Sequence, residues 1–277
     1  MSTFVNCLFR GLSCLPLPVL HALGWPLGWL SFWLSARYRQ RLLANAALAE
    51  VPRRQAWASV AEAGKLVTEL PRLWLGRPVP VHWRGAEHIE AALAEGQGLL
   101  FLTPHLGCFE ITAQAYAARF GALHPMTVLF RPARQPWLRD LVAGARQRPG
   151  LRTAPTTLAG VKQLLKALKG GEAVGLLPDQ VPPMGQGAWA PFFGRDAYTM
   201  TLSARLAHAG PVRVLLSWGE RLSWGRGYVV HVRPLAETLS TDAGLAAAQI
   251  NRAMESLVRE SPTQYLWSYD RYKAPRE

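Results

Sequence analysis

A histidine and a glutamate five residues apart follow a continuous apolar run. Residues 98–103 read GLLFLT, and His105 and Glu110 come shortly after them. Such a run is typical of a buried strand, and the residues after it favour a turn that leads into a helix. With His105 in the turn and Glu110 in the first helical turn, the carboxylate could hold the imidazole in one tautomer while the imidazole takes a proton from a hydroxyl. A turn histidine followed by a glutamate that stabilises the helix N-terminus remains the structural alternative.

Polar residues also follow two other apolar runs. Arg131 comes after MTVLF, and Asp179 and Gln180 come after AVGLLP. Ligands of open α/β sheets bind beyond the carboxyl ends of the strands, so we expect these side chains to converge with the histidine and the glutamate. Arg131 could stabilise an oxyanion, hold a phosphate or lie exposed on the surface. Asp179 and Gln180 could bind substrate hydroxyls or brace the site.

Strands and helices alternate through most of the chain. Short apolar or alternating runs predict strands at 79–83, 98–103, 126–130, 173–177, 212–216 and 228–232. Helical patterns lie between and after them, at about 86–94, 136–148, 157–169, 199–209 and 242–259. Buried strands that alternate with helices predict an α/β fold with a mostly parallel central sheet flanked by helices.

The N-terminal segment carries no charged side chain between Arg10 and Arg37. A helix over residues 18–35 would be about 27 Å long, which is barely a membrane span, and Pro26 would kink it. A helix that spans the membrane, a helix that lies in the membrane interface and a buried core helix all remain open.

Tryptophans and arginines in this region favour a membrane. Trp25, Trp29 and Trp33 share one helical face, which suits the headgroup zone. A basic cluster follows them, formed by Arg37, Arg39 and Arg41. We therefore expect residues 1–41 to be a hydrophobic and basic helical anchor and residues 42–277 to be the catalytic domain.

The charge of the chain indicates an anionic partner. Lys and Arg number 31 and Asp and Glu 18, a net charge of +13, although only 18% of the residues are charged. Between residues 131 and 169 there are nine basic residues and one acidic residue. An anionic membrane surface or an acidic carrier protein fits this pattern, whereas no nucleic-acid-binding motif accompanies it. The sequence has no zinc-binding motif or Cys/His cluster, and its three cysteines form no disulfide framework, so we expect no metal and no cofactor.

The ordered motifs resemble those of the bacterial lipid A biosynthesis (lauroyl/myristoyl) acyltransferases, within the H-x4-D/E glycerolipid acyltransferase superfamily. The matching pieces are His105 with Glu110, Phe130-Arg131-Pro132, Asp179-Gln180, Pro191-Phe192-Phe193-Gly194, and a tail from Asn251 to Lys273. The chain departs from the family pattern at Cys108-Phe109, where Asn-Trp is common, at Gln264-Tyr265-Leu266-Trp267, where Q-W-L-W is common, and at Asp270.

The resemblance implies a membrane-associated O-acyltransferase without a cofactor, on the cytoplasmic face of the bacterial inner membrane. It would move a fatty acyl group from an acyl carrier protein thioester to a hydroxyl of a lipid A precursor or a related (glyco)lipid. His105 and Glu110 would be catalytic, and Arg131, Asp179 and Gln180 would bind substrate. The oxyanion would be stabilised by backbone N–H groups after His105 or by Arg131.

Other chemistries use the same residues. A lysophospholipid acyltransferase or an acyl-thioester hydrolase could rely on the same histidine–glutamate dyad. Cys108 paired with His105 would instead form a covalent acyl-enzyme.

Overall fold

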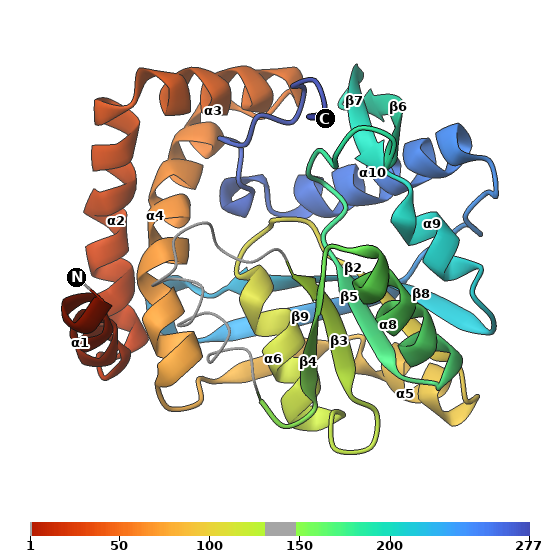
Figure 1. Cartoon of the computed structure of the whole chain (residues 1–277). Coiled ribbons are helices and arrows are strands. Elements are labelled where there is room, and N and C mark those ends of the chain that lie inside the picture. The colour runs from red at the N-terminus through yellow and green to blue at the C-terminus, as the bar shows by residue number, and fades with distance from the viewer. Residues whose placement is uncertain (1, 131–147) are drawn as a thin grey trace.

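The computed structural model describes residues 2–130 and 148–277, in which helices cover both faces of a central sheet (Figure 1). The sheet has the strand order β1-β9-β8-β2-β5-β3-β4. Its strands are Val81–Arg84 (β1), Gly98–Leu102 (β2), Met126–Phe130 (β3), Leu151–Pro155 (β4), Ala173–Leu176 (β5), Val212–Arg221 (β8) and Tyr228–Pro234 (β9). Neighbouring strands are parallel except β8 and β9, which are antiparallel. The predicted α/β class with a mostly parallel sheet is confirmed.

Alternating side chains of the central strand β2 reach two separate hydrophobic cores. Leu100 and Leu102 pack in the core beneath α8 (Leu158–Lys169), α9 (Leu202–Ala207) and α10 (Ala243–Glu260). Leu99 and Phe101 pack in the core beneath α5 (Ala86–Ala94) and α6 (Phe109–Arg119). A strand with both faces covered needs apolar side chains at every position, which is why this run lacks the alternation of a half-exposed strand.

Each of the six predicted strands is present, but other elements differ from the prediction. Residues 195–200 form β7 (Arg195–Met200), which pairs with β6 (Gly187–Phe192) in a separate hairpin. The helix predicted at 199–209 therefore begins only at Leu202 and is short. The helix predicted at 136–148 falls almost entirely outside the described residues.

Four helices precede the sheet: α1 (Ser2–Ser13), α2 (Leu17–Leu34), α3 (Ala36–Leu48) and α4 (Arg53–Leu75). Helix α2 lies directly against α4 (Figure 1). Glycines allow this close approach, because a Cβ atom on Gly28 would be 2.1 Å from the carbonyl oxygen of Val60. A Cβ atom on Gly64 would likewise be 2.0 Å from the carbonyl oxygen of Gly24. The inner face of α2 is therefore part of the folded core.

The outer face of α2 is apolar and exposed. Trp25 and Trp33 are 56% and 66% exposed, Leu30 and Leu34 are also exposed, and Trp29 is half-buried. Among the described residues, no helix combines the length and the hydropathy that crossing a membrane requires. The structure thus gives no support to a spanning anchor, and an anchor that lies in the membrane interface stays a prediction.

Candidate active site

The loops after β2 and β5 bring His105 and Asp179 together. These two strands are parallel neighbours, so their carboxyl ends meet at one edge of the sheet. The Nδ1 atom of His105 is 2.7 Å from Oδ1 of Asp179, and the backbone N–H of His105 donates to Oδ2 at 2.8 Å. One carboxylate therefore holds both the ring and the main chain of the histidine.

Asp179 is buried and ionised. Burial by itself raises the pKa of a carboxyl, but the charge of His105, its two hydrogen bonds and the charge of Arg271 outweigh burial and lower the pKa of Asp179. The hydroxyl of Tyr265 donates to Oδ2 at 3.1 Å. Burial and the negative charge of Asp179 raise the pKa of Tyr265 well above its ordinary value, so the phenol stays protonated and remains a donor.

The other ring nitrogen of His105 meets Gln180. Its Nε2 atom is 3.0 Å from Nε2 of the Gln180 amide. When the ring is neutral and Nδ1–H donates to the carboxylate, the lone pair is on Nε2, and the Gln180 amide is the donor in this contact. Phe109 packs edge-on against the imidazole, with ring centroids 4.9 Å apart. His105 therefore presents a basic nitrogen whose current partner is a neutral amide.

Glu110 does not make the contact with His105 that its spacing suggested. It is buried in the first turn of α6, where Oε2 accepts a hydrogen bond from the indole N–H of Trp74 at 3.4 Å. The carboxylate at Nδ1 of His105 is that of Asp179. His105 lies in the turn after β2 and contacts the loop after β5. Glu110, five residues later, already lies in helix α6. A catalytic function of Glu110 stays a prediction, and Arg131 lies outside the described residues.

Three backbone N–H groups after His105 already have acceptors. The amide of Leu106 donates to Pro104 O at 2.7 Å, that of Gly107 to Gln264 O at 2.9 Å, and that of Cys108 to Gly219 O at 2.8 Å. In this structure these three amides are therefore engaged within the protein, and stabilisation of an oxyanion by backbone amides after His105 stays a prediction.

Cys108 is not placed to act as a nucleophile. The residue is fully buried, and burial together with the charge of Glu69 raises the pKa of its thiol well above the ordinary value. A thiol that stays protonated in the core does not favour a covalent acyl-enzyme.

An open cavity lies between α6 and the sheet, and one of its lining residues is Phe109, whose ring packs against His105. Its lining is mostly apolar and includes Phe101, Tyr116, Met126, Val128, Leu129 and Val230. Phe109 and Glu110, which follow the histidine loop, also line it. Two hydroxyl groups also line the cavity, those of Thr103 and Ser217, and they are hydrogen-bonded to each other at 2.8 Å. The cavity suits an aliphatic chain whose polar end lies near His105. Across residues 2–130 and 148–277, no three His, Cys, Asp or Glu side chains gather as a metal site would require.

Comparison with known proteins agrees with these features. A sequence model for bacterial lipid A biosynthesis acyltransferases matches residues 1–274. The chain belongs to this family. It is 28% identical to a lipid A biosynthesis lauroyltransferase of Escherichia coli, over 95% of this chain and 88% of that protein. It is 26% identical to a lipid A biosynthesis palmitoleoyltransferase of the same organism, over 68% of this chain and 60% of that protein. It is also 30% identical to a lipid A biosynthesis acyltransferase of Haemophilus influenzae, over 66% of this chain and 56% of that protein.

The C-terminal tail of this acyltransferase is part of the site, which the sequence did not indicate beyond its resemblance to the family. Tyr265 binds Asp179, and the amide of Leu266 donates to His105 O at 3.1 Å. Arg271 is buried and donates to the Thr199 hydroxyl at 2.6 Å. These residues are more than 80 positions from Asp179, and no local pattern could have placed them beside it.

Proposed function

We propose that the chain is a membrane-associated O-acyltransferase that moves a fatty acyl group from an acyl carrier protein thioester to a hydroxyl of a lipid A precursor or a related glycolipid. The observation that carries this proposal is the placement of His105. Its Nδ1 side is fixed by the buried Asp179, and Phe109, which packs against its ring, also lines an apolar cavity. That pairing suits a base that deprotonates a hydroxyl next to a bound acyl chain.

The reaction would proceed by direct transfer. The acceptor hydroxyl replaces the Gln180 amide at His105 Nε2 and gives up its proton as its oxygen attacks the thioester carbonyl. The tetrahedral intermediate collapses when the C–S bond breaks, and the departing sulfur takes the proton from the imidazolium. Asp179 stabilises the imidazolium between these two steps.

Gln180 is the side chain that we assign to the developing oxyanion. Its amide nitrogen is within hydrogen-bonding distance of the base, so it also lies near the carbon that the hydroxyl attacks. Three backbone amides after His105, those of Leu106, Gly107 and Cys108, already have acceptors, whereas the Gln180 side chain is a neutral donor beside the base.

Two surfaces would meet the two substrates. The exposed apolar face of α2 would rest in the membrane interface, where tryptophan rings are favoured. Exposed lysines on α8, at positions 162, 166 and 169, would attract an acidic carrier protein. Figure 1 shows α2 and α8 on opposite sides of the molecule, so a lipid acceptor and a water-soluble donor would not compete for one surface.

The test is a reconstituted transfer assay. Purified enzyme in mixed micelles receives acyl carrier protein thioester and a lipid A precursor, and mass spectrometry measures the acylated lipid. His105→Ala should lower turnover by about 10³-fold or more. Lysophospholipid is the matched alternative acceptor, and acyl-CoA is the alternative donor. Release of free fatty acid at the same rate with and without acceptor would show a thioester hydrolase instead.

A further inference from the structure

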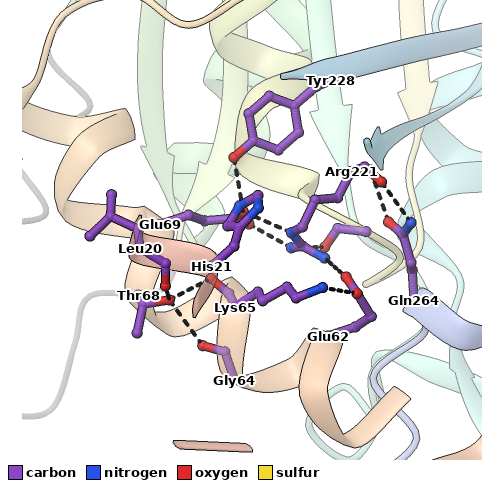
Figure 2. A network of polar contacts seen from close by, with 11 residues as sticks. Leu20, His21, Glu62, Gly64, Lys65, Thr68, Glu69, Arg221, Tyr228 and Gln264 are labelled. Carbon is purple, nitrogen blue, oxygen red and sulfur yellow. Dashed lines mark hydrogen bonds and ion pairs between the residues drawn. The ribbon is translucent and has the colours of Figure 1, made fainter. Parts of the chain in front are cut away.

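A buried ion pair lies beneath the histidine loop, outside the residues used for the chemistry above. Arg221, at the end of β8, and Glu69, on α4, are both almost fully buried (Figure 2). The guanidinium donates from Nε to Oε2 of Glu69 at 2.8 Å and from Nη2 to Oε1 at 2.6 Å. Burial by itself raises the pKa of Glu69, but Arg221 and His21 outweigh it and hold that pKa at about 2. The pair is therefore fully charged near neutral pH.

Other elements converge on this pair. His21 from α2 is 3.1 Å from Oε2 of Glu69, and the hydroxyl of Tyr228, at the start of β9, donates to the same oxygen at 2.8 Å. Arg221 also donates from Nη1 to Glu62 at 2.8 Å. Figure 2 shows these side chains arranged around the guanidinium. Two glutamates of α4 thus hold the Arg221 side chain, and residues from α2 and β9 hold Glu69 in turn.

Arg221 also reaches the histidine loop. Its Nη2 atom donates to the carbonyl oxygen of Gly107 at 3.3 Å. The amide of the same glycine donates to Gln264 O at 2.9 Å. The Gln264 side chain in turn accepts from the Arg221 backbone N–H at 2.9 Å and donates to the Arg221 carbonyl at 3.0 Å. Arg221 and Gln264 therefore hold each other and hold both polar backbone groups of Gly107.

Gly107 is at a position that only glycine fits. Its φ of +60° is in the left-handed region, and a Cβ atom there would lie 2.0 Å from Gly219 O. His105 is only two residues away, so a displacement of Gly107 moves the imidazole relative to Asp179. Catalytic groups generally tolerate displacements of only about 0.5 Å.

Stability alone is a weak reason for this arrangement. Two buried charges lose their hydration, and a well-packed apolar pair is often at least as stable as a buried ion pair. An apolar pair could not donate to the Gly107 carbonyl. The structural feature specific to the charged pair is this contact with the loop.

We propose that Arg221, held by Glu69 and by Gln264, is a positioning residue that fixes the His105–Gly107 loop for catalysis. The proposal rests on the function proposed above. Neither Arg221 nor Glu69 touches the reacting atoms, so both act through the position of His105.

Arg221→Lys is the first test. Lysine keeps the positive charge beside Glu69, but three N–H donors on one nitrogen cannot replace the four hydrogen bonds that the guanidinium makes from three nitrogens. We expect kcat to fall by about 10-fold to 100-fold, with the KM for each substrate nearly unchanged, when both proteins are assayed well below their melting temperatures. If the variant does not fold, Gln264→Met removes the clamp on Arg221 at nearly constant length and should give the same loss in kcat.

Tyr228→Phe is the matched control. It removes a hydrogen bond from the same carboxylate without touching the loop, so it should lower the melting temperature while kcat stays within about twofold of wild type. If Tyr228→Phe loses as much kcat as Arg221→Lys, the function of Arg221 is purely structural and the proposal is overturned. A wild-type kcat in Arg221→Lys, or in Gln264→Met where only that variant folds, would overturn it as well.

A second readout does not depend on acyl transfer. In ¹⁵N-histidine-labelled protein, the Nδ1–H proton that His105 donates to Asp179 should give a downfield NMR signal, which His105→Gln identifies by its loss. This signal should shift or broaden in Arg221→Lys and stay in place in Tyr228→Phe. An unchanged signal in Arg221→Lys contradicts the positioning role. If the wild-type enzyme shows no acyl transfer but the NMR signal shifts as expected in Arg221→Lys, only the proposed function is contradicted.

Discussion

His105 lies between a charged acceptor and a neutral donor. Asp179 fixes Nδ1 as the protonated nitrogen, and Gln180 contacts Nε2 without competing for a proton. An amide is a weak partner compared with a carboxylate, so an incoming hydroxyl can replace it. In the proposed reaction, this arrangement keeps His105 oriented before substrate arrives.

Asp179→Asn should lower kcat by about 10²-fold to 10⁴-fold and leave the KM for both substrates nearly unchanged, because a neutral amide neither selects the Nδ1–H tautomer nor stabilises the imidazolium. Steady-state kinetics on protein with a native circular dichroism spectrum measures this. Asp196→Asn, on the exposed part of β7, is the control and should be fully active. If Asp179→Asn keeps more than about a tenth of the wild-type kcat, Asp179 does not assist His105 in catalysis.

The sequence was sufficient to bring His105, Asp179 and Gln180 to one edge of the sheet, because each follows an apolar run that forms a strand. It was not sufficient to choose the carboxylate at Nδ1. That choice depends on β2 and β5 being neighbours, and strand order is not visible in the local pattern. Glu110 was nearer in sequence, but Asp179 is nearer in space.

At the scale of elements, apolar pattern predicted every strand with a continuous or strictly alternating run and missed those without one. β4 reads LRTAP and lies at the edge of the sheet, where Arg152 and Thr153 are exposed. β6 contains Gly187 and Pro191, residues that usually argue against a strand. Neither strand has a continuous or strictly alternating apolar run, which explains why hydrophobicity did not reveal them.

Helix α2 has two faces with different roles, and its sequence resembled a membrane segment because both faces are apolar. The inner face packs on α4 through glycines, while the outer face exposes tryptophan and leucine side chains. Removal of the whole helix would also remove His21 from Glu69. Substitutions on the outer face alone are therefore the appropriate test of membrane binding.

The double variant Trp25→Ser/Trp33→Ser should bind liposomes of anionic phospholipid at least about tenfold more weakly, because two large exposed rings no longer enter the interface. Flotation in high salt measures the bound fraction, and the melting temperature should remain close to that of wild type. Trp189→Ser is the control, since Trp189 is similarly exposed on the β6–β7 hairpin. Equal binding by the double variant and the wild type would exclude this face of α2 as the anchor.

At the scale of the whole molecule, buried carboxylates connect stability to pH. The pKa of Glu69 is about 2 in the folded chain and near 4.3 in an unfolded chain, so protonation of Glu69 disfavours the folded state. Its contribution is fully present above the unfolded value and is lost as the pH falls from about 5 toward 2. The lowered pKa of Asp179 acts in the same direction.

Glu69→Gln should therefore reduce the loss of unfolding free energy between pH 6 and pH 3 by an amount on the order of 2 kcal/mol. Urea denaturation at both pH values, followed by tryptophan fluorescence, measures the two free energies. Glu260→Gln, which removes an exposed ion pair with Arg233, is the control and should leave the pH dependence as it is. An identical pH dependence in Glu69→Gln and wild type would show that Glu69 does not carry this linkage.

The contact between the histidine loop and the C-terminal segment also sets an order of events during synthesis. Residues 264–266 supply an acceptor for Gly107, a donor for the His105 carbonyl and the phenol that binds Asp179. A ribosome makes the loop more than 150 residues before it makes these partners. The strands of the sheet and α2 are thus synthesised before His105 and Asp179 can make these contacts. The contacts that orient His105 form only after the C-terminal segment has left the exit tunnel.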